Sequence, residues 1–287
     1  MEILHLNGRW QFKQTTTDEW HPATVPGCVH TDLLANEMIP DPFYRDNELA
    51  VMWVGEADWV YRHRFTVTAD FLAHEQVLLR CEGLDTLATI WLNGQEVGRT
   101  NNAFRTWEFD GRPFLHPGDN DIAIRFDSAV NYAAAKLKEH YIHGWGFGVD
   151  KLPGGNYLRK SQCNFGWDWG PKLATCGVWR DIALVGYNTA RLADVYLVQD
   201  HAQPGQVGVS CRVAATATQA GLTAHITIHH NGAEVVAQTI ALENGSGTAE
   251  FVISAPQLWW PNGLGEQPLY TVVVQLLDGE ERPLDNW

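Results

Sequence analysis

The feature of this sequence that most constrains its fold is a hydrophobic period of two, interrupted at short intervals by turn residues. Runs of β-branched and aliphatic residues, each bounded by Gly, Pro, Asn or Asp, occur at residues 60–67, 76–81, 86–92, 120–127 and 178–187. A period of two puts alternate side chains on one face of a strand. Many short strands at this spacing predict an all-β chain made of sandwiches or barrels.

Two Asn-Gly dipeptides predict tight hairpins. Asn93-Gly94 and Asn231-Gly232 each lie between two runs of β formers. A type I′ turn needs a positive φ at both central positions, which Asn and Gly adopt readily. Helical signals are few: residues 31–37 and 128–141 predict short helices, the second with Ser128 available as its N-cap.

The distribution of tryptophan predicts two domains. Residues 1–189 hold ten of the 13 Trp, whereas residues 190–287 hold three and consist mainly of plain Val, Thr, Ala and Ile strands. We therefore expect a first domain over 1–189 and a second over 190–287. The second domain shows about six strand-like segments in a length typical of an immunoglobulin-like sandwich.

The charge balance argues against one class of partner. The chain has 20 Lys and Arg and 34 Asp and Glu, which gives a formal net charge of −14. Binding to nucleic acid needs a basic face, so we expect no nucleic-acid partner. No window approaches the ~18 uncharged apolar residues that span a bilayer, so we also expect no membrane contact.

The cysteines and the first residues indicate a compartment. The five cysteines are odd in number and widely spaced in a large chain, which predicts free thiols in a reducing environment. Residues 1–10 show no basic leader, no apolar run and no small-residue cleavage site, so they do not resemble a signal peptide. Together these features predict a cytoplasmic location.

Residues 161–171 hold the most concentrated group of candidate site residues. Their Gly, Pro and Asn content predicts a loop, and within it Asp168 lies between Trp167 and Trp169. A carboxylate can accept hydrogen bonds from two adjacent sugar hydroxyls, while an indole covers the apolar face of the ring. In the alternative interpretation, the two indoles anchor a core and Asp168 caps a turn.

Other motifs predict no chemistry. His140 and His143, and the adjacent His229 and His230, have no acidic or thiol partner at ligand spacing, so we expect structural histidines and no metal or other cofactor. A retaining glycosidase needs two carboxyl groups ~5 Å apart. No acidic pair in the sequence is convincingly placed for that role, so no catalytic residue is predicted.

Several segments resemble glycoside hydrolase family 2, and specifically its β-mannosidase branch. The Trp-Asp-Trp-Gly-Pro run at 167–171 is typical of that branch, and residues 177–182 resemble the segment that closes the first domain across the family. The other matching segments are residues 25–34, 39–48, 58–62, 91–98, 258–263 and 267–270.

The resemblance implies a jelly-roll, galactose-binding-like sandwich followed by an immunoglobulin-like sandwich whose last strand would begin just after Trp287. In the family a (β/α)₈ barrel follows and carries both catalytic glutamates. The family's acid/base lies in an Asn-Glu pair of that barrel, so Asn47-Glu48, which lies in the N-terminal segment of this sequence, should not inherit its role. The chain is therefore predicted to be an N-terminal fragment without catalytic residues.

The resemblance also implies a function for the Trp-Asp-Trp run. The family's enzymes hydrolyse terminal, non-reducing β-D-mannose with retention, and a loop of the first domain reaches the barrel pocket. Asp168 would contact hydroxyls of the sugar at the cleavage site, and Trp167 and Trp169 would touch that sugar or orient the loop. Trp53 and Glu56 are weaker candidates, on the ground of their nearness to residues 39–48.

The partners implied are a β-mannoside and the chain's own barrel, and the fragment alone is expected to be inactive. Two other classes of protein stay open. One is a stand-alone carbohydrate-binding module, and the other is a sandwich scaffold that contacts no sugar.

Overall fold

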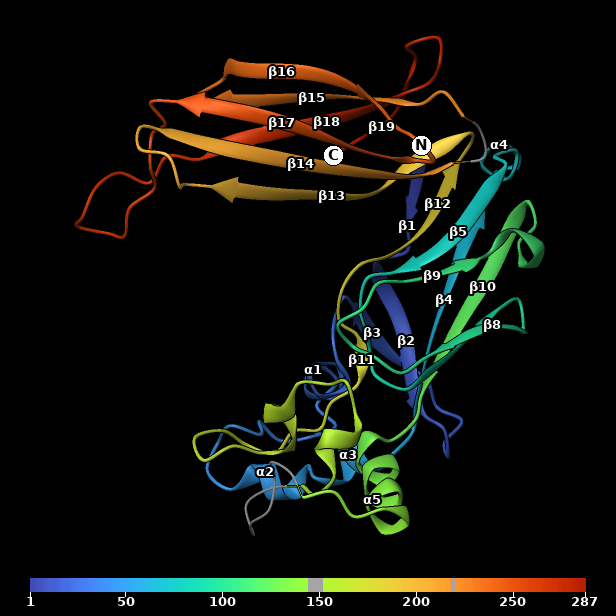
Figure 1. Ribbon diagram of the computed structural model, residues 1–287. Helices are drawn as coiled ribbons and strands as arrows, with labels where there is room; N and C mark the ends of the chain where they lie inside the picture. Colours follow the sequence, from blue (N-terminus) through green and yellow to red (C-terminus); the bar gives the residue numbers. More distant parts are fainter. Residues whose placement is uncertain (144–151, 218–219) are drawn as a thin grey trace. The chain divides into compact units, whose positions relative to one another are not determined.

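The computed structural model describes residues 1–143, 152–217 and 220–287 (Figure 1). Its contacts divide the chain into two compact units, Glu2–Gly186 and Tyr187–Trp287, the latter together with Met1. Strands dominate both units, so the prediction of an all-β chain is confirmed.

The first unit is a sandwich of two principal sheets. One has the strand order β1-β12-β5-β9 and the other β3-β2-β4-β10-β7-β8, and β11 pairs with β6 separately. The strands are β1 (Glu2–His5), β2 (Gly8–Gln14), β3 (His21–Val25), β4 (Trp59–Val67), β5 (Gln76–Cys81), β6 (Leu84–Asp85), β7 (Ala88–Leu92), β8 (Gln95–Thr100), β9 (Trp107–Asp110), β10 (Gly118–Phe126), β11 (Gly177–Val178) and β12 (Ile182–Tyr187).

Alternating side chains of these strands make one aromatic core. Along β4, Trp59, Tyr61, Phe65 and Val67 are buried, whereas Arg64 and Thr66 are exposed. The ring centroid of Phe12 lies 5.8 Å from that of Trp59 and 5.7 Å from that of Tyr61. Leucines of β5 and β12 pack into the same cluster, so both sheets share this core.

The hairpin predicted at Asn93-Gly94 is confirmed. Both residues have positive φ, 48° for Asn93 and 77° for Gly94, and they join β7 to β8. The Asn93 side-chain amide also donates to the carbonyl oxygen of Phe114 at 2.8 Å and to the Asn120 side chain at 2.7 Å.

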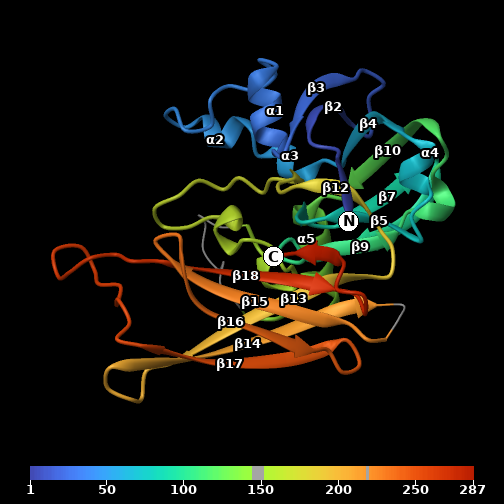
Figure 2. The same cartoon turned by 90° about the horizontal axis from the view of Figure 1, so that it is seen from above.

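The two predicted helices are present with slightly different bounds. They are α1 (Val29–Ala35), which lies beside β3 in Figures 1 and 2, and α5 (Ala129–Glu139), whose first turn is capped by the Ser128 hydroxyl as expected. The remaining helical elements are α2 (Asn47–Ala50), α3 (Trp53–Glu56), α4 (Ala69–Leu72), η1 (Arg112–Phe114), η2 (Gly155–Tyr157) and η3 (Gln162–Phe165). In Figure 1, α1, α2, α3 and α5 gather at one end of the first unit.

The second unit is a smaller sandwich with the sheets β13-β14-β17 and β16-β15-β18-β19. Valines of β14 and isoleucines of β15 face each other in its core. Asn231 (φ 50°) and Gly232 (φ 79°) turn the chain between β15 and β16, which confirms the second hairpin. The strands are β13 (Ala190–Asp200), β14 (Gln206–Ala217), β15 (Thr223–His230), β16 (Ala233–Ala241), β17 (Ser246–Ser254), β18 (Tyr270–Leu277) and β19 (Pro283–Asn286).

The second unit includes a short edge strand that the sequence analysis did not predict. This strand, β19, pairs with β18, and Trp287 exchanges two backbone hydrogen bonds with Val274. The sequence hid β19 because Pro, Asp and Asn are depleted in strands. The buried Asp285 carboxylate of β19 accepts a hydrogen bond from the Leu192 backbone at 2.8 Å, which ties β19 to β13.

Candidate functional site

The Trp-Asp-Trp segment forms a tight turn, which confirms the predicted loop. After η3, Gly166 has a φ of 107°, a conformation that a side chain would strain. Trp167 and Gly170 then exchange backbone hydrogen bonds of 3.4 and 3.5 Å. Asp168 and Trp169 therefore occupy the two central positions of the turn and are both exposed.

The exposure of this turn argues against the interpretation of both indoles as core anchors. Trp169 is 76% exposed, and its ring lies 5.8 Å from that of Trp167 at an interplanar angle of 45°. Only Trp167 is partly buried. Within the described residues, the Asp168 carboxylate makes no hydrogen bond, so it caps no turn there.

A hollow of about 410 Å³ lies beside the turn and brings in residues that the sequence did not single out. Its walls are residues 167–172 of the loop together with Pro42, Phe43, Arg45 and Glu48. The Lys172 ammonium lies 3.9 Å from the Glu48 carboxylate, a loose ion pair across the hollow. Because these partners lie more than a hundred positions apart in the chain, no local pattern could have indicated them.

The hollow combines the two kinds of group that bind sugars. Exposed aromatic faces are available at Trp169 and Phe43. Charged donors and acceptors are available at Asp168, Arg45 and Lys172. Carboxylate and guanidinium groups make strong hydrogen bonds with hydroxyls, while a ring face covers the C–H face of a pyranose.

The structure does not bring Trp53 and Glu56 to this hollow. The ring of Trp53 packs 5.9 Å from that of Trp59, at the end of the first core. The backbone carbonyl of Glu56 accepts a hydrogen bond of 2.7 Å from the Asn131 side chain, which joins α3 to α5. Both side chains are exposed and lie outside the lining of the hollow.

Beneath the loop lies a buried charged group. The Lys160 ammonium donates to the Asp85 carboxylate and, at 2.8 Å, to the backbone carbonyl of Thr175. The side chain of Lys160 is fully buried. Nearby in α1, burial and then the Lys160 charge lower the pKa of His30 to about 4, so His30 is neutral at pH 7.

The lowered pKa of His30 predicts a loss of stability in mild acid. Folding weakens proton binding at His30. The contribution of the neutral His30 to the free energy of unfolding is therefore complete above pH 6.5 and is lost as the pH falls toward 4. Between pH 7 and 4, the free energy of unfolding should fall by about 2 to 3 kcal/mol more in the wild type than in His30→Gln. Urea unfolding at several pH values measures both curves. The exposed His5→Gln is the control, and parallel wild-type and His30→Gln curves would contradict the prediction.

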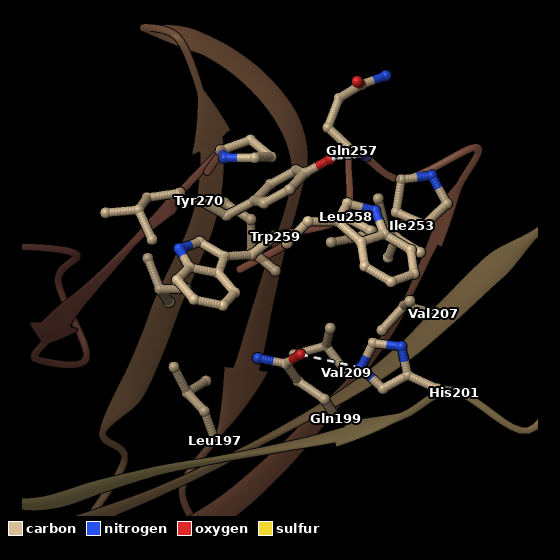
Figure 3. A pocket seen from close by; sticks show the side chains of 16 residues that line it. Leu197, Gln199, His201, Val207, Val209, Ile253, Gln257, Leu258, Trp259 and Tyr270 are labelled. Atoms are coloured by element: carbon tan, nitrogen blue, oxygen red, sulfur yellow. Dashed lines mark hydrogen bonds between the residues drawn. The ribbon is translucent and has the colours of Figure 1, made fainter. Parts of the chain in front are cut away.

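The second unit has a larger hollow of about 540 Å³, at one end of its sandwich (Figure 3). Its floor consists of core side chains such as Val207, Val209 and Ile253. Trp259 lines it, and the Tyr270 hydroxyl accepts a hydrogen bond from the Gln257 backbone at 2.9 Å. An apolar floor offers little to sugar hydroxyls, so the charged hollow of the first unit is the better candidate.

The adjacent histidines His229 and His230 contact neighbouring side chains of the second unit. The ring of His230 stacks on Tyr270 at 4.7 Å, and His229 lies 3.0 Å from the Thr227 hydroxyl. In the part of the chain that the structure describes, no three His, Cys, Asp or Glu side chains gather as metal ligands would. All five cysteines are free thiols, as their odd number and wide spacing in a large chain predicted. Over the same residues, no helix has the length and apolar character needed to cross a membrane.

Comparison with known families identifies the class of protein. Residues 10–180 match the family described as glycosyl hydrolase 2 galactose-binding domain-like, and residues 190–287 match glycosyl hydrolases family 2. The chain therefore belongs to glycosyl hydrolase family 2. Within that family its similarity is to the β-mannosidase branch, as the sequence motifs indicated.

The relatives in that branch are about three times longer than this chain. β-Mannosidase B of Thermothelomyces thermophilus is 34% identical over 97% of this chain and 33% of its own length, and that of Aspergillus clavatus is 36% identical over 98% and 34%. The crystal structure of a β-D-mannosidase from Dictyoglomus thermophilum matches 99% of this chain and 35% of its own at 37% identity, with a TM-score of 0.89. A β-glucuronidase from Bifidobacterium dentium, at 22% identity and a TM-score of 0.68, shares the fold.

Proposed function

We propose that this chain is the N-terminal part of a retaining β-mannosidase that hydrolyses terminal, non-reducing β-D-mannose residues. The observation that carries the proposal is the exposed turn at Asp168 beside a charged hollow, in a chain whose relatives are β-mannosidases. We further propose that the domains span 1–189 and 190–287 and that the protein works in the cytoplasm, where its free thiols would persist.

In this proposal the chain holds the substrate and a barrel performs the chemistry. Asp168 accepts hydrogen bonds from two adjacent hydroxyls of the mannose, and Trp167 and Trp169 flank the ring. Retaining hydrolysis needs a nucleophilic carboxylate and an acid/base carboxylate ~5 Å apart across the scissile bond. Both would come from a C-terminal barrel, so the chain requires no metal or other cofactor for its own part.

The proposal predicts a division of activity between the chain and a longer protein. The 287 residues alone should not hydrolyse an aryl β-D-mannoside. The same residues joined to the remaining two thirds of the Dictyoglomus thermophilum enzyme should hydrolyse it with retention, which NMR of the first-formed sugar anomer measures. The unmodified relative is the positive control. Turnover by the pure chain would overturn the division, and inversion would overturn the mechanism.

One observation favours a second function, a stand-alone carbohydrate-binding module. The hollow and its exposed Trp169 lie entirely within the first unit, so a sugar could bind without a barrel. Isothermal titration with mannose and methyl β-mannoside distinguishes the two functions. Part of an enzyme pocket should bind more weakly than millimolar, and a tighter affinity that is lost in Trp169→Ala would favour the module.

A further inference from the structure

One buried ammonium joins both ends of the candidate loop to the sandwich. Lys160 immediately precedes the loop, and Thr175 follows it. The Lys160 ammonium donates to the backbone carbonyl of Thr175 and to the carboxylate of Asp85, which belongs to β6. The backbone of Asp85 also pairs with Gly177 of β11, so the same strand receives the chain as it leaves the loop.

This arrangement is more than a generic ion pair. The Lys160 side chain is fully buried and that of Asp85 almost so, and burial of either charge without the other is strongly unfavourable. The exposed pair Lys136 and Glu139 in α5 shows the contrast, because solvent screens it and it bridges a single helix turn. Lys160 begins the segment, and its ammonium bonds to the carbonyl at the other end and to the sandwich, so it fixes the separation of the two ends.

The loop has one further anchor before its turn: Phe165 is buried in a cluster with Ala133 and Leu158, and its carbonyl oxygen accepts a hydrogen bond of 2.7 Å from the Leu152 backbone. The turn itself is defined by local bonds, such as those between Trp167 and Gly170. After the turn, the loose ion pair of Lys172 with Glu48 is a weak restraint. The direction in which Asp168 points therefore depends on how the two ends of the loop are fixed, as well as on Phe165.

We propose that Lys160 is the positioning residue of the mannoside site, because its ammonium closes the base of the loop that presents Asp168. This inference rests on the proposed function for the identity of the ligand. The restraint on the loop can be measured without any sugar. A residue that merely stabilised the fold would affect the loop and the sheets alike, whereas a positioning residue affects the loop selectively.

Hydrogen–deuterium exchange, followed by mass spectrometry, tests the proposal on the 287-residue chain. The variants are Lys160→Met, the double variant Lys160→Met/Asp85→Leu and the control Lys136→Met. The double variant removes both buried charges, which often restores stability, but it does not restore the bond to Thr175. Peptides that contain the amides of Asn164, Gly166 and Gly170 report on the loop, and peptides of β4 report on the sheet.

The expected result is exchange at least about tenfold faster in the loop of the double variant, with β4 unchanged. Lys136→Met should match the wild type in both regions. Wild-type exchange in the loop of the double variant, or equal acceleration in the loop and β4, would overturn the proposal. Should Lys160→Met alone fail to fold, the double variant still decides. Failure of the proposed function would appear separately, as an absent effect of Asp168→Ala on mannoside hydrolysis.

Discussion

Replacement of Asp168 by alanine should lower kcat/KM for an aryl β-mannoside by about 100-fold or more, in an enzyme that carries this chain followed by its barrel. A charge-assisted hydrogen bond contributes about 1.5–3 kcal/mol, and a loss of 2.7 kcal/mol corresponds to 100-fold. Asp168 lies exposed at the corner of its turn, so its removal should leave folding intact. Steady-state kinetics measures the effect, which should appear in kcat if the contact strengthens in the transition state.

Two further variants make this result specific. Asp168→Asn keeps the shape and one acceptor oxygen but removes the charge, so its kcat/KM should lie between those of the wild type and Asp168→Ala. Asp18→Ala removes another exposed carboxylate of the first unit, away from the hollow, and should have no effect. A decrease of less than about threefold in Asp168→Ala would reject a contact between Asp168 and the sugar.

The second large effect should follow removal of a buried carboxylate. Asp32 in α1 accepts a hydrogen bond of 2.7 Å from the Tyr61 hydroxyl and one of 2.9 Å from the Thr24 backbone. Tyr61 is completely buried in the first core, and burial raises the pKa of Asp32 above its usual range. Asp32→Ala leaves both donors without a partner, so the free energy of unfolding should fall by about 3 kcal/mol.

A double-mutant cycle separates the hydrogen bond from general packing. The double variant Asp32→Ala/Tyr61→Phe no longer has the buried hydroxyl that Asp32→Ala leaves without a partner. Its loss in the free energy of unfolding should therefore be smaller, by at least about 1 kcal/mol, than the sum of the losses in the two single variants. Urea unfolding, followed by tryptophan fluorescence, measures each variant. Asp119→Ala is the matched control, because its carboxylate accepts a similar bond from Thr66 at an exposed site. Additive effects of the two substitutions would show that Tyr61 and Asp32 are not coupled.

The local features of this fold could be predicted from the sequence because their determinants are local. Alternation along residues 60–67 specifies the buried face of β4, and Asn93-Gly94 supplies the positive φ values that its hairpin needs. The loop around Asp168 was likewise evident from its Gly and Pro content. Its exposure, by contrast, depends on the tertiary structure, so the sequence alone could not exclude the core-anchor interpretation.

The parts of the site that were not predicted depend on distant partners. Arg45 and Glu48 line the hollow because the segment that leads into α2 lies beside the loop, and nothing in residues 39–48 indicates this. Lys160 and Asp85 are 75 positions apart, so their ion pair is equally invisible in the sequence. Trp53, although near residues 39–48 in the sequence, does not line the hollow.

The buried pair of Lys160 and Asp85 also limits how this chain can change over evolutionary time. Substitution of one partner alone produces a protein with an uncompensated buried charge. Such a charge lowers the free energy of unfolding by about 3–5 kcal/mol, out of a total of about 5–15 kcal/mol. Homologous chains should therefore keep both residues or replace both together. Reconstructed ancestral sequences would show the order of such replacements. Where only one of the two residues has been lost, a stabilising substitution elsewhere in the chain should have come first.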